Sequence, residues 1–139
     1  MKSYKLRGYR IYSIFFMNST RVALIAPGKN EEFAVQEPLN LGYIAAYLEK
    51  HNIQVNIIDQ LAGQNVYREL KRISPQIVGI TGTTPVITAA YKIADFCRQN
   101  NILTVIGGVH ASTLPEEALK HADIVVKGGR TSNVRNRSK

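Results

Sequence analysis

The sequence predicts a doubly wound α/β domain in which a five-stranded parallel sheet has helices on both faces. Five short apolar runs alternate with four helical patterns between residues 21 and 126. Parallel neighbours need right-handed helical crossovers, so this alternation favours a parallel sheet rather than hairpins. The strands read as continuous apolar runs, which is typical of strands buried on both faces.

The first unit begins with a continuous apolar strand at residues 22–26, which Pro27 ends. After a long loop, Pro38 opens a helix that runs out near Asn52. Its apolar residues recur at i, i+3, i+4 and i+7, the stripe of a helix lying on a sheet: Leu41, Ile44, Ala45 and Leu48.

The second unit repeats the pattern with a strand at residues 55–59 and a helix over residues 66–73. That helix stops before Pro75, because a residue preceding proline avoids the helical conformation. Asp59 ends the second strand, and a polar position at the rim of the sheet is its simplest interpretation.

The third strand covers residues 77–81. Thr84 is the predicted N-cap of the helix that follows, with Pro85 in its first turn. Cys97 shares an apolar helix face with Val86, Ala90 and Ile93. We therefore expect a buried cysteine that packs as a small hydrophobe, not a reactive thiol.

The fourth strand, residues 102–106, ends in Gly107 and Gly108, where two missing side chains would let a ligand approach the backbone. Thr113 and Glu116 have the spacing of a capping box.

The capping-box spacing of Thr113 and Glu116 predicts a helix at residues 115–121, which the fifth strand follows at residues 123–126. In a flavodoxin-like strand order, the loops after strands one, three and four converge at the carboxyl edge of the sheet, where ligands bind. These loops are residues 27–38, 81–84 and 107–112.

The net charge of +8 does not describe the predicted domain. Residues 1–19 hold four of the 18 Lys and Arg and residues 127–139 hold five, with no acidic residue in either segment. The other nine bases face all ten acids within residues 20–126, a net charge of −1. With no Trp and no RNA-binding signature, nucleic acid is not an expected partner.

The two ends match no unit of the repeating pattern. We expect a basic leader at residues 1–19, mobile or added, the folded domain at residues 20–128, and a basic disordered tail at residues 129–139. The leader faintly resembles a signal peptide but has no small-residue cleavage site, and no segment approaches the roughly 20 apolar residues that span a bilayer. A cytoplasmic protein without a membrane partner is expected.

One cysteine rules out a disulfide framework and any cysteine-rich metal or iron–sulfur site made by this chain alone. The ends of strands one and three lack the carboxylates that hold Mg²⁺ in a phosphate-accepting receiver domain. Glu31 and Glu32 in the first loop would repel the phosphate of a flavin nucleotide. The glycine fingerprints of dinucleotide and triphosphate sites are absent. What remains suits a bulky, mostly uncharged ligand between small residues and hydroxyls.

At this point the sequence resembles a known family, the cobalamin-binding domain found at the N-terminus of cobalamin-dependent radical S-adenosylmethionine enzymes. The resemblance covers residues 21–128. It rests on four motifs taken together: Val22–Pro27, Glu37–Leu48, Val78–Thr84, and Val105–His110 with Pro115.

The resemblance implies that the nucleotide tail of cobalamin inserts along the sheet edge while the corrin ring rests over the loops. The residues that it implies for cofactor binding are Pro27, Thr81, Gly82, Thr83, Thr84, Gly107, Gly108 and His110. No catalytic residue, metal ligand or iron–sulfur cluster is expected in this chain. The three glycines would leave room for a flat group, and Gly108 is expected to line an open cleft.

The sequence departs from the family in two places. The methionine-synthase-like branch supplies a cobalt ligand from Asp-x-His-x-x-Gly after strand one, whereas residues 28–42 contain no histidine or aspartate. In radical enzymes strand five runs into Gly-Glu-Gly-Glu and a domain with Cys-x-x-x-Cys-x-x-Cys, but here Lys127-Gly128 leads into the basic tail. We expect a truncated or frameshifted product, or a separated domain whose radical S-adenosylmethionine partner is another polypeptide.

Several side chains keep more than one interpretation. His110 has three interpretations. It forms a hydrogen bond to the corrin amides or the nucleotide phosphate, it has a structural role, or it ligates cobalt. His51 and His121 lie at helix C-terminal ends, where positive charge is favourable, and need no function. Tyr43 and Tyr47 share a helix face that could cover the core or line the ring.

Three functions follow. The first is a cobalamin-binding module without activity of its own, which holds the cofactor with its base off cobalt and without a histidine ligand. The second is a cofactor-free α/β interaction domain that docks a protein at the sheet edge. The third is an enzyme that uses His110 and Asp59 as acid and base, which requires both in one cleft.

Overall fold

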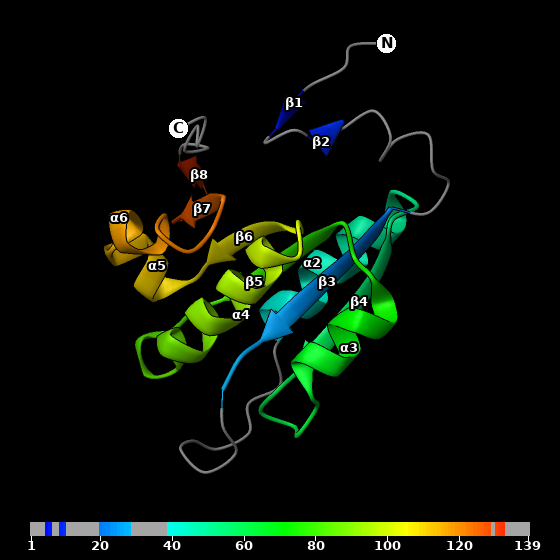
Figure 1. Cartoon of the computed structure of the whole chain (residues 1–139), viewed down its shortest axis with the longest axis horizontal. Coiled ribbons are helices and arrows are strands. Elements are labelled where there is room, and N and C mark those ends of the chain that lie inside the picture. The colour runs from blue at the N-terminus through cyan, green and yellow to red at the C-terminus, as the bar shows by residue number, and fades with distance from the viewer. Residues whose placement is uncertain (1–4, 7–8, 11–19, 29–38, 129, 133–139) are drawn as a thin grey trace.

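The computed structural model describes residues 5–6, 9–10, 20–28, 39–128 and 130–132, and it confirms the doubly wound α/β fold (Figure 1). The main sheet has six strands in the order β4-β3-β5-β6-β7-β8. The first five are parallel, and β8 runs antiparallel to β7. Numbered along the chain, the parallel strands have the order 2-1-3-4-5 of flavodoxin-like sheets.

The elements lie close to the predicted residues. The parallel strands are β3 (Arg21–Ala26), β4 (Gln54–Asp59), β5 (Ile77–Thr81), β6 (Leu103–Gly107) and β7 (Ile124–Lys127). The helical elements are α2 (Leu39–Lys50), α3 (Val66–Ile73), η1 (Thr84–Val86), α4 (Ile87–Gln99), α5 (Val109–Thr113) and α6 (Pro115–Ala118). The remaining strands are β8 (Arg130–Ser132) and a separate antiparallel pair, β1 (Lys5–Leu6) with β2 (Tyr9–Arg10).

Helix α3 begins and ends as its sequence predicts. The side chain of Asn65 caps its N-terminus by accepting a bond of 3.1 Å from the Arg68 N–H. At the other end Ser74 adopts a left-handed conformation with φ 48°, and its N–H donates to the Leu70 carbonyl. Pro75 follows, so the chain leaves the helix and enters β5.

The two predicted caps at threonine are wrong. Thr84 starts the short 3₁₀ helix η1 rather than capping α4, and no side-chain cap bond is present there. Thr113 donates its hydroxyl to the Val109 carbonyl at 2.9 Å, so it does not form a capping box with Glu116. The predicted helix at residues 115–121 is shorter, because only α6 at Pro115–Ala118 forms there, and a second short helix that was not predicted, α5, occupies most of the predicted loop at residues 107–112. The break between α5 and α6 is at Leu114, which precedes a proline and has non-helical φ and ψ of −123° and 62°.

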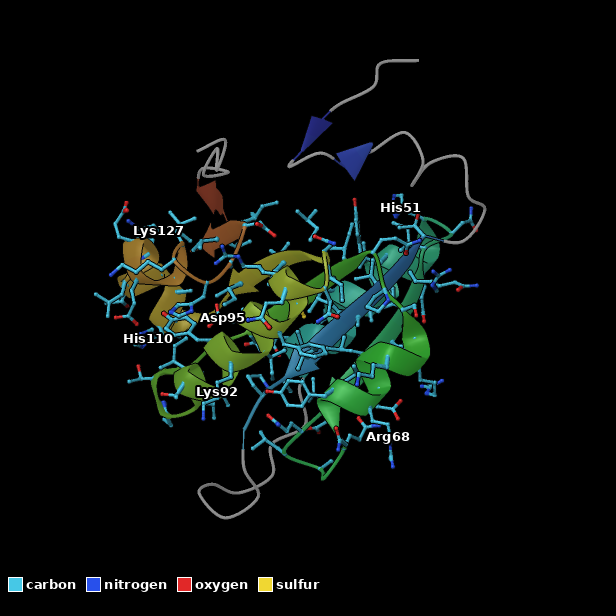
Figure 2. All side chains as sticks on the ribbon, viewed as in Figure 1. His51, Arg68, Lys92, Asp95, His110 and Lys127 are labelled. Carbon is cyan, nitrogen blue, oxygen red and sulfur yellow. The ribbon has the colours of Figure 1, made fainter. Side chains whose placement is uncertain are left out.

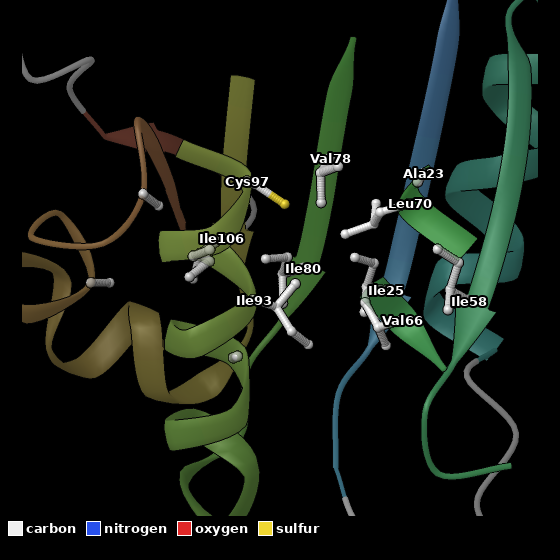
Figure 3. Packing of buried hydrophobic residues seen from close by; sticks show 14 of the residues in the cluster. Ala23, Ile25, Ile58, Val66, Leu70, Val78, Ile80, Ile93, Cys97 and Ile106 are labelled. Carbon is white, nitrogen blue, oxygen red and sulfur yellow. The ribbon is translucent and has the colours of Figure 1, made fainter. Parts of the chain in front are cut away.

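The main core lies between one face of the sheet and helices α3, α4, α5 and α6 (Figure 3). Alternate residues of the strands point to this face, as strand geometry requires. The core includes Ile25, Val78, Ile80, Ile93 and Ile106, each at most 3% exposed. Cys97 is fully buried among them, and its burial raises the pKa of the thiol to about 12, which confirms the prediction of a core cysteine.

The opposite face is only partly covered. In the described part of the chain α2 is the one helix on this face, and it packs on β3 and β4 with Leu41 and Ala45 against Val22 and Leu24. The face of β5, β6 and β7 beside it has no described helix over it. The candidate site lies between α2 and this uncovered face of the sheet.

Strand β8 forms at residues that the sequence analysis assigned to a disordered tail. Lys127 pairs with Arg130, so the two strands are joined by a two-residue loop that begins at Gly128, whose φ is 52°. A Gly-Gly pair between strands is a known hairpin signal, and it was available in the sequence. The rest of the tail, most of the basic leader and the loop at residues 29–38 lie outside the described residues.

Candidate functional site

An apolar cavity of about 430 Å³ lies between α2 and the uncovered part of the sheet. Its upper end, at the carboxyl ends of β5 and β6, is lined by Asn40, Thr81, Gly107 and Gly108. Its lower end, toward the amino ends of β3 and β5, is lined by Thr20, Leu48, Ile53 and Ile77. Because a strand rises about 3.3 Å per residue, the four steps from Ile77 to Thr81 make the cavity roughly 13 Å long.

Two glycines form a flat part of the sheet surface in this cavity. A Cβ at Gly107 would meet only the Cβ of Val126, at 3.6 Å, which is an ordinary contact. A Cβ at Gly79 would lie 2.9 Å from the flexible end of Leu24. Gly79 was not among the predicted binding residues, although it is two residues before Thr81 and therefore on the same face of β5.

Gly108 packs against the backbone of the loop after β5. A Cβ at Gly108 would lie 2.6 Å from the carbonyl oxygen of Gly82, and its φ is +108°. Gly82 is itself buried, and a Cβ there would lie 2.8 Å from Ile87. Gly108 lines the cavity as expected, but its Cβ direction faces the Gly82 backbone and not open space, so glycine is required there by packing.

Backbone hydrogen bonds join the loops after β5 and β6. The Gly82 N–H donates to the Gly107 carbonyl at 2.8 Å, and the His110 N–H donates to the Gly82 carbonyl at 3.2 Å. These bonds satisfy backbone groups that would otherwise be unpaired where the two strands end. The upper end of the cavity is therefore a fixed edge.

The predicted binding residues fall into two groups. Thr81, Gly107 and Gly108 are among the described residues that line the cavity. The others are not among them: Pro27 and Gly82 are buried, Thr83 and Thr84 are exposed, just before η1 and at its first residue, and His110 lies in α5. The lining residues that sequence reasoning missed belong mainly to α2 and to the lower halves of the strands.

His110 is held by side chains of the neighbouring helices. Its Nε2 lies 3.1 Å from Glu117 Oε1 and its Nδ1 lies 3.1 Å from Thr84 Oγ1. Because a carboxylate only accepts, Nε2 donates to Glu117, and in the neutral ring Nδ1 then accepts from the Thr84 hydroxyl. The side chain is only 11% exposed. Figure 2 shows it beside α5, far from His51 at the end of α2.

The network continues to a second histidine. The Tyr91 hydroxyl donates to the same Glu117 oxygen at 2.9 Å, and the ring of Tyr91 stacks on His121 with centroids 4.1 Å apart. His121 Nδ1 lies 3.0 Å from both carboxylate oxygens of Asp95. Burial and the bond to Glu117 raise the pKa of Tyr91, so the phenol stays a donor. These contacts hold α4, α5 and α6 together.

Glu117 predicts a pH dependence of stability. Hydrogen bonds from His110 and Tyr91 lower the pKa of this carboxyl from its ordinary value of 4.5. A lowered folded-state pKa stabilises the fold above the ordinary value, and that contribution is lost as the pH falls through the lowered one. We expect the free energy of unfolding to hold between pH 7 and about 5 and to fall below about 4.5.

Urea denaturation at a series of pH values measures this effect. The free energy of unfolding should decrease less steeply with falling pH in Glu117→Gln than in the parent chain. Glu116→Gln, on the exposed surface of the same helix, is the matched control and should leave the slope unchanged. An unchanged slope in Glu117→Gln would contradict the assignment.

Asp59 and His110 do not share a cleft. Asp59 Oδ1 accepts from the Ala62 N–H at 3.2 Å and so closes the loop after β4. Strands β3 and β5 lie between β4 and β6, the strand that leads to His110. The acid–base pair required by the third hypothesis is therefore absent at these two residues.

The described residues contain no group of three or more His, Cys, Asp or Glu side chains that could hold a metal ion. No helix in the same part of the chain is long and apolar enough to cross a membrane. Tyr43 and Tyr47 are 79% and 65% exposed on the outer side of α2, so they do not cover the core.

A protein-family model described as the B12 binding domain matches residues 34–136, which agrees with the resemblance drawn from the four motifs. An uncharacterized methyltransferase of Pyrococcus horikoshii is 31% identical over 99 residues, covering 66% of this chain and 22% of the relative. Bacteriochlorophyllide d C-8(2)-methyltransferase of Chlorobaculum tepidum is 50% identical over 52 residues, covering 37% of this chain and 12% of the relative. The chain thus spans less than a quarter of either protein.

Among solved structures, the cobalamin-dependent S-adenosylmethionine radical enzyme OxsB, with aqua-cobalamin and S-adenosylmethionine bound, has a similar fold. The TM-score is 0.70 at 19% identity, and the match covers 91% of this chain and 21% of that chain. At this level of identity the likeness shows the fold alone.

Proposed function

Because the chain belongs to the B12-binding domain family, we propose that it holds cobalamin with the nucleotide tail in the cavity between α2 and the sheet. The cavity itself is the observation that carries this proposal. Pockets for small molecules have volumes of about 300–1,000 Å³, and the volume here, about 430 Å³, suits a nucleotide-sized group but not a complete corrinoid. The corrin ring would stay outside, over the fixed edge formed by the loops.

The described residues fit such a tail. Gly107 leaves its part of the sheet surface free of side chains, and over Gly79 lies only the flexible end of Leu24, so a flat group can lie against this part of the sheet. Thr81 and Asn40 place a hydroxyl and an amide at the upper end, where they would hold the polar ribose and phosphate. Backbone hydrogen bonds of Gly82 to Gly107 and to His110 hold the two strand ends at the mouth in fixed positions. When bound, the cofactor supplies a cobalt centre that can carry a methyl group or support a rearrangement.

We further propose that the base is detached from cobalt and that no histidine of this chain replaces it. A tail that enters the cavity has to leave the ring. A histidine ligand needs one free ring nitrogen and a partner that orients the other. Both ring nitrogens of His110 are engaged by Thr84 and Glu117, which supports a structural role for this residue.

Electron spin resonance of the Co(II) form tests this assignment. We expect no splitting of the cobalt lines by a coordinated nitrogen, because neither the base nor a histidine should be bound to the metal. Nitrogen splitting would overturn it. The same spectrum of His110→Ala would then show whether His110 was the ligand, since the splitting would disappear in that variant.

The chemistry that the cofactor serves is proposed to lie outside these residues. The two curated relatives are methyltransferases of which this chain covers 22% and 12%, so the remaining parts of such proteins would bind the substrate. We propose a radical S-adenosylmethionine catalytic domain as the partner and no activity for the chain alone. A cytoplasmic location is proposed because a single cysteine suits a reducing compartment.

A cofactor-free interaction domain is the second candidate, because α2 exposes Tyr43, Ile44 and Tyr47 to solvent. Titration with hydroxocobalamin separates the two. A shift of the visible spectrum supports the cobalamin module. If the spectrum does not change and the purified protein carries no corrinoid, the interaction domain is the better assignment.

A further inference from the structure

The cavity changes its chemical character along its length. The polar side chains Asn40 and Thr81 lie at the upper end, beside the strand termini. Below them the walls are aliphatic on both sides, from α2 and from the strands. The described side chains of this lower part are Val22, Leu24, Leu41, Ile44, Leu48, Ile53, Ile77 and Val105.

The backbone of the lower part offers no hydrogen bonds either. Strand β5 is paired on both sides, with β3 and β6, and β6 is paired with β5 and β7. Their N–H and C=O groups are therefore used within the sheet. Thr20 at the far end is already engaged in an interaction of its own. Between Thr81 and Thr20, a polar group would lose its water without gaining a partner from the described residues.

We infer that this cavity selects corrinoids by the chemistry of their lower base, and that it prefers benzimidazole or phenol bases to adenine. The inference rests on the proposed function, since it assumes that the tail enters the cavity. A phenol base linked through oxygen presents only carbon atoms to the walls. Dimethylbenzimidazole, once off cobalt, presents one ring nitrogen and two methyl groups. Adenine presents several ring nitrogens and an amino group.

The size of the preference follows from the cost of burying unpaired polar groups. One such group typically weakens binding by about tenfold or more. Adenine has more of these groups than either other base, so we expect an adenine corrinoid to bind at least about tenfold more weakly than a phenol one. Asn40 and Thr81 do not remove this difference, because the ribose and phosphate that all three corrinoids share lie beside them.

Titration of the purified chain with four corrinoids tests the inference: cobalamin, p-cresolylcobamide, adeninylcobamide and the tail-less cobinamide. Visible spectra report binding in each case. The main comparison is between the affinities for cresolylcobamide and adeninylcobamide. Phenol does not coordinate cobalt and adenine coordinates it weakly, so detaching the base from cobalt costs little free energy in either case. We expect cresolylcobamide to bind at least tenfold more tightly than adeninylcobamide, and cobinamide to bind most weakly.

A single wall substitution provides the second measurement. Val105→Thr keeps the shape of the side chain but adds a hydroxyl to the wall. It should therefore reduce the ratio of the affinity for cresolylcobamide to that for adeninylcobamide by several-fold. Val55→Thr is the matched control, because Val55 packs under the same helix but is not among the lining residues. The ratio should not change in that variant.

The possible failures are distinguishable. Equal binding of the cresolyl and adeninyl forms would overturn the inference while leaving cobalamin binding intact. Cobinamide binding as tightly as cresolylcobamide would also overturn it, because the tail would then not enter the cavity. If none of the four corrinoids binds, the proposed function fails, and the inference fails with it.

Discussion

Gly107→Leu is expected to abolish cobalamin retention while leaving the fold intact. The residue ends β6 on the cavity face, and its backbone is not in the left-handed region. A Cβ at this position meets only Val126 at ordinary contact distance, so the strand can accept a side chain. A leucine there would extend toward α2 and occupy the volume proposed for the nucleotide tail. We expect affinity for cobalamin to fall by about a hundredfold or more, as a steric block would cause.

The experiment compares corrinoid retained after gel filtration with the midpoint of thermal unfolding. The midpoint should stay within a few degrees of the parent value. Gly42→Leu is the matched control, because a Cβ at Gly42 has no described neighbour within 4 Å. It should leave cobalamin retention unchanged and raise the midpoint by a few degrees at most, because leucine is favoured over glycine in the interior of α2 by somewhat less than about 1 kcal/mol. Retention of cobalamin by a folded Gly107→Leu chain would show that the tail lies elsewhere.

Gly108→Ala, one residue later, is expected to destabilise the fold strongly. Its Cβ would lie 2.6 Å from the Gly82 carbonyl oxygen and 3.0 Å from the Gly82 nitrogen, both backbone atoms of a fixed loop. The φ of +108° adds strain for any residue with a side chain. Together we expect a loss of about 3 kcal/mol or more in the free energy of unfolding.

Thermal denaturation should show this loss as a decrease in midpoint of about 10 °C. Gly107→Ala is the neighbouring control, and its midpoint should change by no more than a few degrees. Comparison of the variants at Gly107 and Gly108 therefore distinguishes a glycine that leaves space in the cavity from one that backbone packing requires. An unchanged midpoint in Gly108→Ala would mean that the Gly82 loop can move, and the fixed edge described above would be wrong.

Periodicity was sufficient to predict most of the fold. The helix faces through Val66, Leu70 and Ile73 and through Ala90, Ile93 and Cys97 are buried as expected. These predictions succeeded because burial of a helix face depends on spacing within a single element. The alternation of strands and helices predicted a parallel sheet, whereas the strand order 2-1-3-4-5 came from the flavodoxin-like topology adopted for it, because alternation alone does not fix the order.

The site was predicted less completely, because its residues are brought together by contacts distant in sequence. His110 follows the glycine pair and so looked like a pocket residue, but Glu117 and Thr84 hold its ring among the helices. Ile44 and Leu48 read as ordinary core positions of α2, yet they line the cavity. That difference depends on the absence of a described helix over β5 and β6, which no local pattern reveals.

The sheet topology also bears on how the chain folds. Among the described strands of the main sheet, only β7 and β8 pair through a short turn. Every other pairing is parallel and joins segments about 20 to 55 residues apart, as in the contacts of β3 with β4 and β5. Such long-range pairings slow folding, because loop-closure entropy is lost before the contacts form. The cavity needs α2, β3, β5 and β6 in place together, so it is complete only after these long-range pairings have formed. Acquisition of a corrinoid would therefore report the formation of these pairings rather than an early collapsed state.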